Sequence, residues 1–273
     1  MKRLVFLLWF SLIFGFSCSK KEAAPVIVVI PKPCLLTGIT IVQEIYSTVT
    51  IFTYNTENRL ISVKETQSNG KDNVASIVNY KYTNGVLVSA RATTLDNTPL
   101  NNEAFWTVQN GRVLKSEGNG LTVDIGYNAE RIQSWQLKVS NGTEISYSPV
   151  IDADGNLKTD FYTYKQVAPT TYEESTTFAF SNFDSKNNPY GLIAKAMGVS
   201  YFFKETGARY MTEAISKNNP ATVQKITTFP YGIQTSAYQY AYQYNTNDYV
   251  TQSTATAVGL PTIITTFEYS NCN

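Results

Sequence analysis

The residues of this sequence that could do chemistry are mainly acidic, because the chain contains no histidine. Without histidine, Ser-His-Asp and Cys-His catalysis are excluded, and so is the most common metal ligand. Two carboxylates about 5 to 10 Å apart could instead hydrolyse a glycosidic bond. The candidates for such a pair are Asp152, Asp154, Asp160, Glu173 and Glu174. No sequence pattern directs them to one cleft, so we expect a non-catalytic protein, with glycoside hydrolysis as a remote alternative.

The segment Asp152-Ala153-Asp154-Gly155-Asn156 alternates oxygen-bearing side chains, as the start of a calcium loop does. An EF-hand also needs a third ligand before its glycine and a glutamate near position 12. This chain has Thr163 at that place. We therefore predict a β-turn, no bound metal and no cofactor. Zinc is also unsupported, because no two cysteines have CxxC spacing.

The first residues of the chain have the pattern of an export signal. Lys2 and Arg3 precede an apolar run from Leu4 to Phe14, which is shorter than the roughly 20 residues of a transmembrane helix. Residues 15–18, Gly-Phe-Ser-Cys, resemble a bacterial lipobox, with glycine where that pattern has leucine. The resemblance implies that Cys18 is lipidated and becomes the mature N-terminus. The alternative is an ordinary signal peptide with an incidental cysteine.

These features divide the chain into three parts: a signal peptide over 1–17, a lipidated N-terminus and tether over 18–33, and a single domain over 34–273. Pro25, Pro31 and Pro33 disfavour a helix in the tether. The apolar run 26–30 alternatively adds an edge strand. Twenty-two basic residues balance 21 acidic ones, so no electrostatic footprint for nucleic acid appears.

Two cysteines remain near the ends of the domain if Cys18 carries lipid. Exported proteins meet an oxidising environment, in which such a pair closes. We therefore predict a disulfide between Cys34 and Cys272, with two free thiols as the alternative.

The domain is dominated by alternating apolar and polar residues separated by Asn-rich and Gly-rich turns. In one example, residues 51–54 (Ile-Phe-Thr-Tyr) lead through Asn55-Thr56-Glu57-Asn58 into residues 59–63 (Arg-Leu-Ile-Ser-Val). Period-two alternation predicts strands, and turns rich in Asn and Gly predict hairpins. We expect a mainly β fold, a broad curved antiparallel β-meander of successive hairpins.

At three turns the chain resembles tyrosine-rich YD-type repeats. The best copies are Tyr54-Asn55 with Asn58-Arg59-Leu60, Tyr127-Asn128 with Arg131-Ile132, and Asp154-Gly155-Asn156-Leu157. Together with the lipobox, these motifs resemble meander lipoproteins of uncharacterised function from Bacteroidota. That resemblance implies an envelope location and a curved sheet over about residues 34–272, and it supplies no catalytic residue.

One segment, near residues 190–215, breaks the alternation and predicts a short helical insert. Ile193 and Met197 have helical i, i+4 spacing, and Arg209 to Ile215 offers a second short helix. Two identical Ser-Lys-Asn-Asn-Pro segments, 185–189 and 216–220, bracket the insert. We expect a helical lid or plug that packs on the sheet or closes its end. A duplicated ligand loop is the alternative.

Four tyrosines alternate along one strand and share one face: Tyr238, Tyr240, Tyr242 and Tyr244. Such a row could stack on sugars or form a protein-binding hot spot. Alternatively, the rings pack under a neighbouring hairpin or the helical insert. We expect an outer-membrane lipoprotein, facing the periplasm or the cell surface, held to the membrane by its lipid. It would bind a glycan or an envelope protein, and a structural scaffold without a specific ligand is the alternative.

Overall fold

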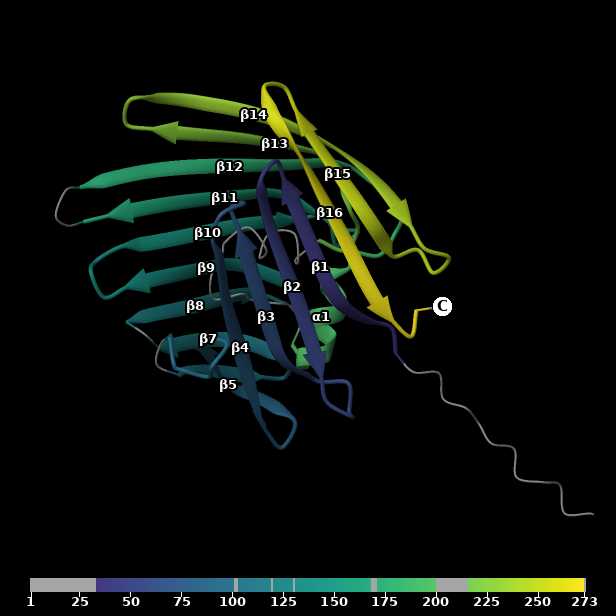
Figure 1. Ribbon diagram of the computed structural model, residues 1–273. Helices are drawn as coiled ribbons and strands as arrows, with labels where there is room; N and C mark the ends of the chain where they lie inside the picture. The colour runs from purple at the N-terminus through teal and green to yellow at the C-terminus, as the bar shows by residue number, and fades with distance from the viewer. Residues whose placement is uncertain are drawn as a thin grey trace, which may run out of the picture. The chain divides into compact units, whose positions relative to one another are not determined.

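The computed structural model describes residues 33–100, 103–118, 120–129, 131–167, 171–199 and 216–272. Within these ranges, sixteen strands form a closed antiparallel barrel (Figure 1). Each strand pairs with its neighbours in sequence, and β1 closes the ring by pairing with β16. The expected signal peptide, Cys18 and the tether up to Lys32 lie outside the described residues.

The strands run in chain order around the barrel. Their bounds are β1 Leu35–Gln43, β2 Tyr46–Tyr54, β3 Leu60–Ser68, β4 Asn73–Thr83, β5 Val86–Thr93, β6 Ala104–Gln109, β7 Arg112–Gly118, β8 Leu121–Asn128, β9 Arg131–Val139, β10 Glu144–Ile151, β11 Leu157–Gln166, β12 Tyr172–Phe183, β13 Pro220–Phe229, β14 Gly232–Tyr244, β15 Val250–Ala257 and β16 Leu260–Ser270. The helix α1, Tyr190–Met197, lies in the connection between β12 and β13.

The expected open, curved meander is wrong, because the sheet closes on itself. The ladder that closes it runs from Leu35 opposite Ser270 to Val42 opposite Ile264. Local alternation and turns specify which neighbours pair. Closure depends on the number of strands and on their tilt and stagger, which no single hairpin encodes. The barrel also gives no support to the YD-repeat resemblance.

Side chains alternate between the lumen and the outside of the barrel. Phe52 of β2 is buried opposite Val63 of β3, whereas its neighbour Ile51 is 45% exposed. Across the closing ladder, Ile39 faces Phe267 in the interior. The lumen therefore receives the larger apolar side chains of most strands.

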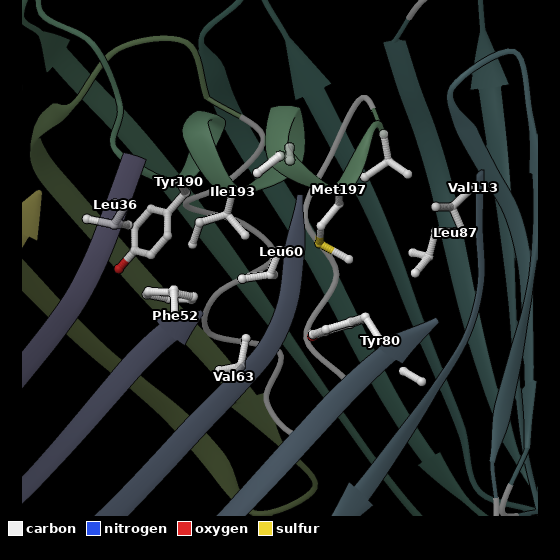
Figure 2. Packing of buried hydrophobic residues seen from close by; sticks show 14 of the residues in the cluster. Leu36, Phe52, Leu60, Val63, Tyr80, Leu87, Val113, Tyr190, Ile193 and Met197 are labelled. Atoms are coloured by element: carbon white, nitrogen blue, oxygen red, sulfur yellow. The ribbon is translucent and has the colours of Figure 1, made fainter. Parts of the chain in front are cut away.

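Helix α1 closes one end of the barrel, which we call the helix end. Tyr190, Ile193 and Met197 are buried there among lumen-facing residues of the first strands. Figure 2 shows Ile193 and Met197 pointing toward Leu60 of β3. The helix begins after Pro189 and ends at Gly198, whose φ of 70° suits a left-handed C-cap. The expected helical segment at 209–215 lies outside the described residues.

Tyrosines tie neighbouring hairpins together at the helix end. Each donates its hydroxyl hydrogen bond to a backbone carbonyl 14 to 22 residues earlier in the chain, at 2.5 to 2.9 Å. The pairs are Tyr54 to Leu36, Tyr82 to Leu60, Tyr127 to Val113, Tyr242 to Pro220 and Tyr269 to Val250. These bonds satisfy carbonyls where the strands end, so the tyrosine at each turn has a structural role.

The turns at the helix end are built by side chains that bond to their own backbone. Asn55 Oδ1 accepts hydrogen bonds from the backbone N–H groups of Glu57 and Arg59. Asp152 accepts one in the same way from Asn156. The Asp152–Asn156 segment is therefore a turn of the predicted kind. No group of three or more acidic or cysteine side chains that could hold a metal occurs in the described part of the chain.

A disulfide joins Cys34, before β1, to Cys272, after β16, with the two Cα atoms 4.7 Å apart. It is the pairing expected from the sequence, and it fastens the two strands whose ladder closes the barrel. None of the described helices is long and apolar enough to cross a membrane.

Candidate functional site

The barrel encloses a cavity of about 560 Å³ on one side of its lumen. Its walls come from β10 to β16 and β1, and the start of α1 forms part of one end. We call these strands the hollow half and β2 to β9 the filled half. A cavity of this size is typical of sites that enclose a small organic molecule.

The cavity is apolar toward the helix end. Leu157, Phe180 and Val223 form one buried cluster there. Further apolar side chains complete this floor: Tyr190, Val250 and Phe267. Polar side chains lie farther along the same strands, toward the opposite end: Gln43, Glu174, Thr176, Lys225, Thr227, Gln234 and Thr265. Apolar Phe229, Ala255 and Ile263 also line this upper part. The lumen therefore has an apolar floor and an upper wall of mixed polarity.

The tyrosine row of β14 lies inside the barrel, where Tyr238, Tyr240 and Tyr242 line the cavity. The rings of Tyr240 and Tyr242 stack with centroids 6.0 Å apart. Tyr242 donates to the Pro220 carbonyl, and Tyr244 donates to the Asp184 carboxylate. The row thus faces neither open solvent nor a fully packed core. It is accessible only to a molecule small enough to enter the lumen.

The candidate carboxylates are not brought together as a pair. Asp152 and Asp154 belong to a turn at the helix end, and Glu173 is exposed on the outer wall. Glu174, next in sequence, lines the cavity and accepts a hydrogen bond from the Tyr172 hydroxyl at 2.8 Å.

Asp160 is the most buried of these carboxylates, with 1% of its surface exposed. It faces the interior between Pro149 and Phe178, and its Oδ1 has no hydrogen-bond partner among the described residues. Burial raises the pKa of Asp160 to about 7, although the backbone N–H of Phe161 lowers it. Asp160 is thus a carboxyl that accepts a proton near neutral pH.

Sequence reasoning missed Lys225, which lines the cavity from β13. It pairs with Phe178 on one side and Ser236 on the other, and its Nζ lies 5.9 Å from the centre of the Phe178 ring. The alternation of Val223, Lys225 and Thr227 is visible in the sequence. It does not tell which side of the strand faces inward.

No protein-family model and no curated protein matches the sequence of this chain. Among solved structures, the barrel is similar to a porin-like protein from Bacteroides vulgatus, with a TM-score of 0.56 and 9% identity over 87% of this chain and 99% of that one. It is also similar to a porin-like protein from Bacteroides uniformis, with a TM-score of 0.51 and 15% identity over 86% and 98% of the two chains. The similarity between this chain and these two proteins concerns the fold alone.

The outer wall of this barrel is mixed, because charged side chains alternate there with exposed apolar ones such as Ile51, Phe105 and Phe161. Charged side chains point outward along its strands: Lys64, Lys81, Arg91, Lys115, Glu117, Asp124, Lys138, Glu144, Lys165, Glu173 and Glu268. Lys115, for example, lies between Thr107 and Asp124 and forms an ion pair with Glu117. A barrel embedded in lipid instead presents an apolar band about 25 Å tall, and its lumen is polar. In the described wall, charged and apolar side chains both point outward.

Proposed function

We propose that this chain is a lipid-anchored protein of the cell envelope whose barrel binds a small molecule with an apolar body in its lumen. The observation that supports this most directly is the cavity itself. Its floor is apolar and polar side chains lie farther along its walls, an arrangement that suits the binding of a small molecule inside a barrel. The proposal keeps the expected lipid attachment at Cys18 and makes the lumen, not an outer face, the binding surface.

The same features argue against a water-filled pore. Helix α1 and the side chains around it occupy the helix end, where a pore needs an opening. Apolar side chains such as Phe180 and Val223 would be poorly hydrated in a channel. We also propose no catalytic role, because Glu173 and Glu174 lie on opposite faces of β12 and Asp160 is buried beside Phe178.

Lumen binding can be tested with a neutral apolar fluorophore, N-phenyl-1-naphthylamine, added to the exported chain carrying Cys18→Ala. We expect saturable fluorescence enhancement. Thr265 lines the cavity, and its neighbour Thr266 points outward on the same strand. Thr265→Phe should weaken the enhancement by narrowing the cavity, whereas Thr266→Phe should retain it. Equal enhancement in both variants, or none in the parent, would contradict lumen binding and favour the scaffold alternative.

Lipid anchoring has a separate test. Cells grown with an alkyne fatty acid should label the parent chain and leave Cys18→Ala unlabelled, because that cysteine is the expected acceptor. Equal labelling of the two chains would contradict the anchor and leave the binding proposal standing.

A further inference from the structure

We infer that the molecule bound in the lumen is an amphipathic acid, an apolar chain whose terminal carboxylate pairs with Lys225. This inference rests on the proposed function and adds the chemistry of the ligand's polar end. It follows from the position of Lys225 along the cavity, from its lack of a carboxylate partner among the described residues and from the sign of the other charges nearby.

Lys225 lies at the boundary between the apolar floor and the upper wall, which holds most of the polar lining residues. Val223, two residues toward the helix end on the same strand, belongs to the buried apolar cluster. Thr227, two residues the other way, shares a hydroxyl–hydroxyl hydrogen bond of 3.0 Å with Thr176. A molecule with its chain on the floor would therefore place its polar end beside the Lys225 ammonium.

The Lys225 ammonium has no carboxylate within ion-pair distance in the described part of the chain. Three other lysines have such a partner, at 2.5 to 2.7 Å. They are Lys81 with Glu103, Lys115 with Glu117 and Lys186 with Asp248. The contact found for Lys225 is with the face of the Phe178 ring. A half-buried ammonium beside a ring is a strong site for a carboxylate, because hydrogen bonds between ionised groups are stronger than neutral ones.

The nearby carboxyl groups do not already neutralise this ammonium. Glu174 lines the cavity farther from the floor, and its carboxylate accepts from the Tyr172 hydroxyl. Asp160 lies on the other side of Phe178 in the same register row, and it does not line the cavity. Lys225 is thus the cation among the described lining residues, and an amine ligand would meet repulsion there.

The inference is tested by comparing two competitors of equal chain length, dodecanoic acid and dodecan-1-ol, which displace N-phenyl-1-naphthylamine at pH 8. The parent should bind the acid about tenfold more tightly than the alcohol, as expected for one charge-assisted hydrogen bond of about 1.4 kcal/mol. Lys225→Met should bind both equally, and Lys225→Arg should keep the preference. Lys138→Met, at an exposed outward-facing lysine, should behave as the parent does.

The outcomes separate the inference from the proposed function. Fluorophore binding by every variant, with no preference for the acid in the parent, would overturn the inference alone. Retention of the preference by Lys225→Met would also overturn the inference and leave the proposed function standing. Failure of the parent to bind the fluorophore at all would overturn both. Fluorophore binding by Lys225→Met also shows that this variant has folded.

Discussion

The filled and hollow halves of this barrel have the same strand pattern and differ in packing, because the hollow half combines rings such as Phe180 and Tyr240 with several small lumen-facing side chains. In the filled half, the interior positions hold large residues, among them Phe52, Tyr80, Trp106 and Trp135. In the hollow half, several equivalent positions hold small ones: Ser236, Ser253, Ala255, Thr227 and Thr265. Close packing in one half and an open cavity in the other follow directly from these volumes.

The difference shows that one architecture can place a core and a site side by side. Helix α1 contributes to both, because Ile193 and Met197 pack into the core while Tyr190 also lines the cavity. The filled half and the helix hold the barrel wall in place. The wall therefore does not collapse around the small side chains of the hollow half. Matched substitutions in the two halves test this division of roles.

The largest expected effect is the removal of a ring from the filled half. Trp135 is 4% exposed and stacks on Tyr147 with ring centroids 3.6 Å apart. Trp135→Ala should lower the free energy of unfolding by about 3 to 5 kcal/mol, because it opens a new cavity in a packed region. Tyr240→Ala should cost only about 1 to 2 kcal/mol, because that ring already borders open space.

Denaturant melts of the two variants provide the comparison, with the slope m checked for constancy. Similar losses for Trp135→Ala and Tyr240→Ala would show that the halves are equally packed. That result would contradict the division into core and site.

An intermediate effect is expected from Asp160, the buried carboxyl on the wall of the hollow half. Its pKa of about 7 lies above the ordinary value of 3.8, so between these pH values the folded protein binds more protons than the unfolded chain. The free energy of unfolding should therefore fall as pH rises from about 4 to 7, by on the order of 3 kcal/mol.

Asp160→Asn keeps the shape of the side chain and cannot ionise. Melts at a series of pH values should show that this variant lacks the decline between pH 4 and 7. A parent whose stability rises through that interval, or a variant with the same decline, would show that another group controls it.

The sequence predicts the hairpins because they depend on the local residue pattern. It predicts the disulfide partners because an even number of cysteines remains once Cys18 is set aside. Asn55 and Asp152 mark turns through their own side-chain hydrogen bonds, so their roles follow from residue type. Closure has no such local sign, because β1 and β16 lie at opposite ends of the domain sequence, and the predicted disulfide brings these ends together without specifying that the strands pair. The lumen, and hence the site, follows from closure.

The site residues were missed for the same reason. Lys225 was not named from the sequence, and Asp160 was named only as a candidate catalytic carboxylate, because both occupy strand positions where a charged residue ordinarily faces water. The tyrosine row of β14 was recognised as one face of a strand, but alternation alone does not say whether that face is inner or outer. Closing the sheet places all these side chains in the interior, and only then do they become neighbours.

The smallest expected effect concerns the hydroxyl groups that tie hairpins at the helix end. In the filled half, the Tyr82 hydroxyl donates to the Leu60 carbonyl at 2.7 Å, and Arg59 lies 5.8 Å from the centre of the Tyr82 ring. Tyr82→Phe keeps the ring and leaves a largely buried carbonyl without this donor, so it should lower the free energy of unfolding by about 1 kcal/mol.

In the hollow half, the Tyr164 hydroxyl bonds to the Gln166 side chain at 3.3 Å, far from the helix end. Tyr164→Phe should cost less than about 0.5 kcal/mol, because water can replace that longer bond. Paired melts decide the matter, and a Tyr164→Phe loss as large as that of Tyr82→Phe would show that the ties at the helix end have no special weight.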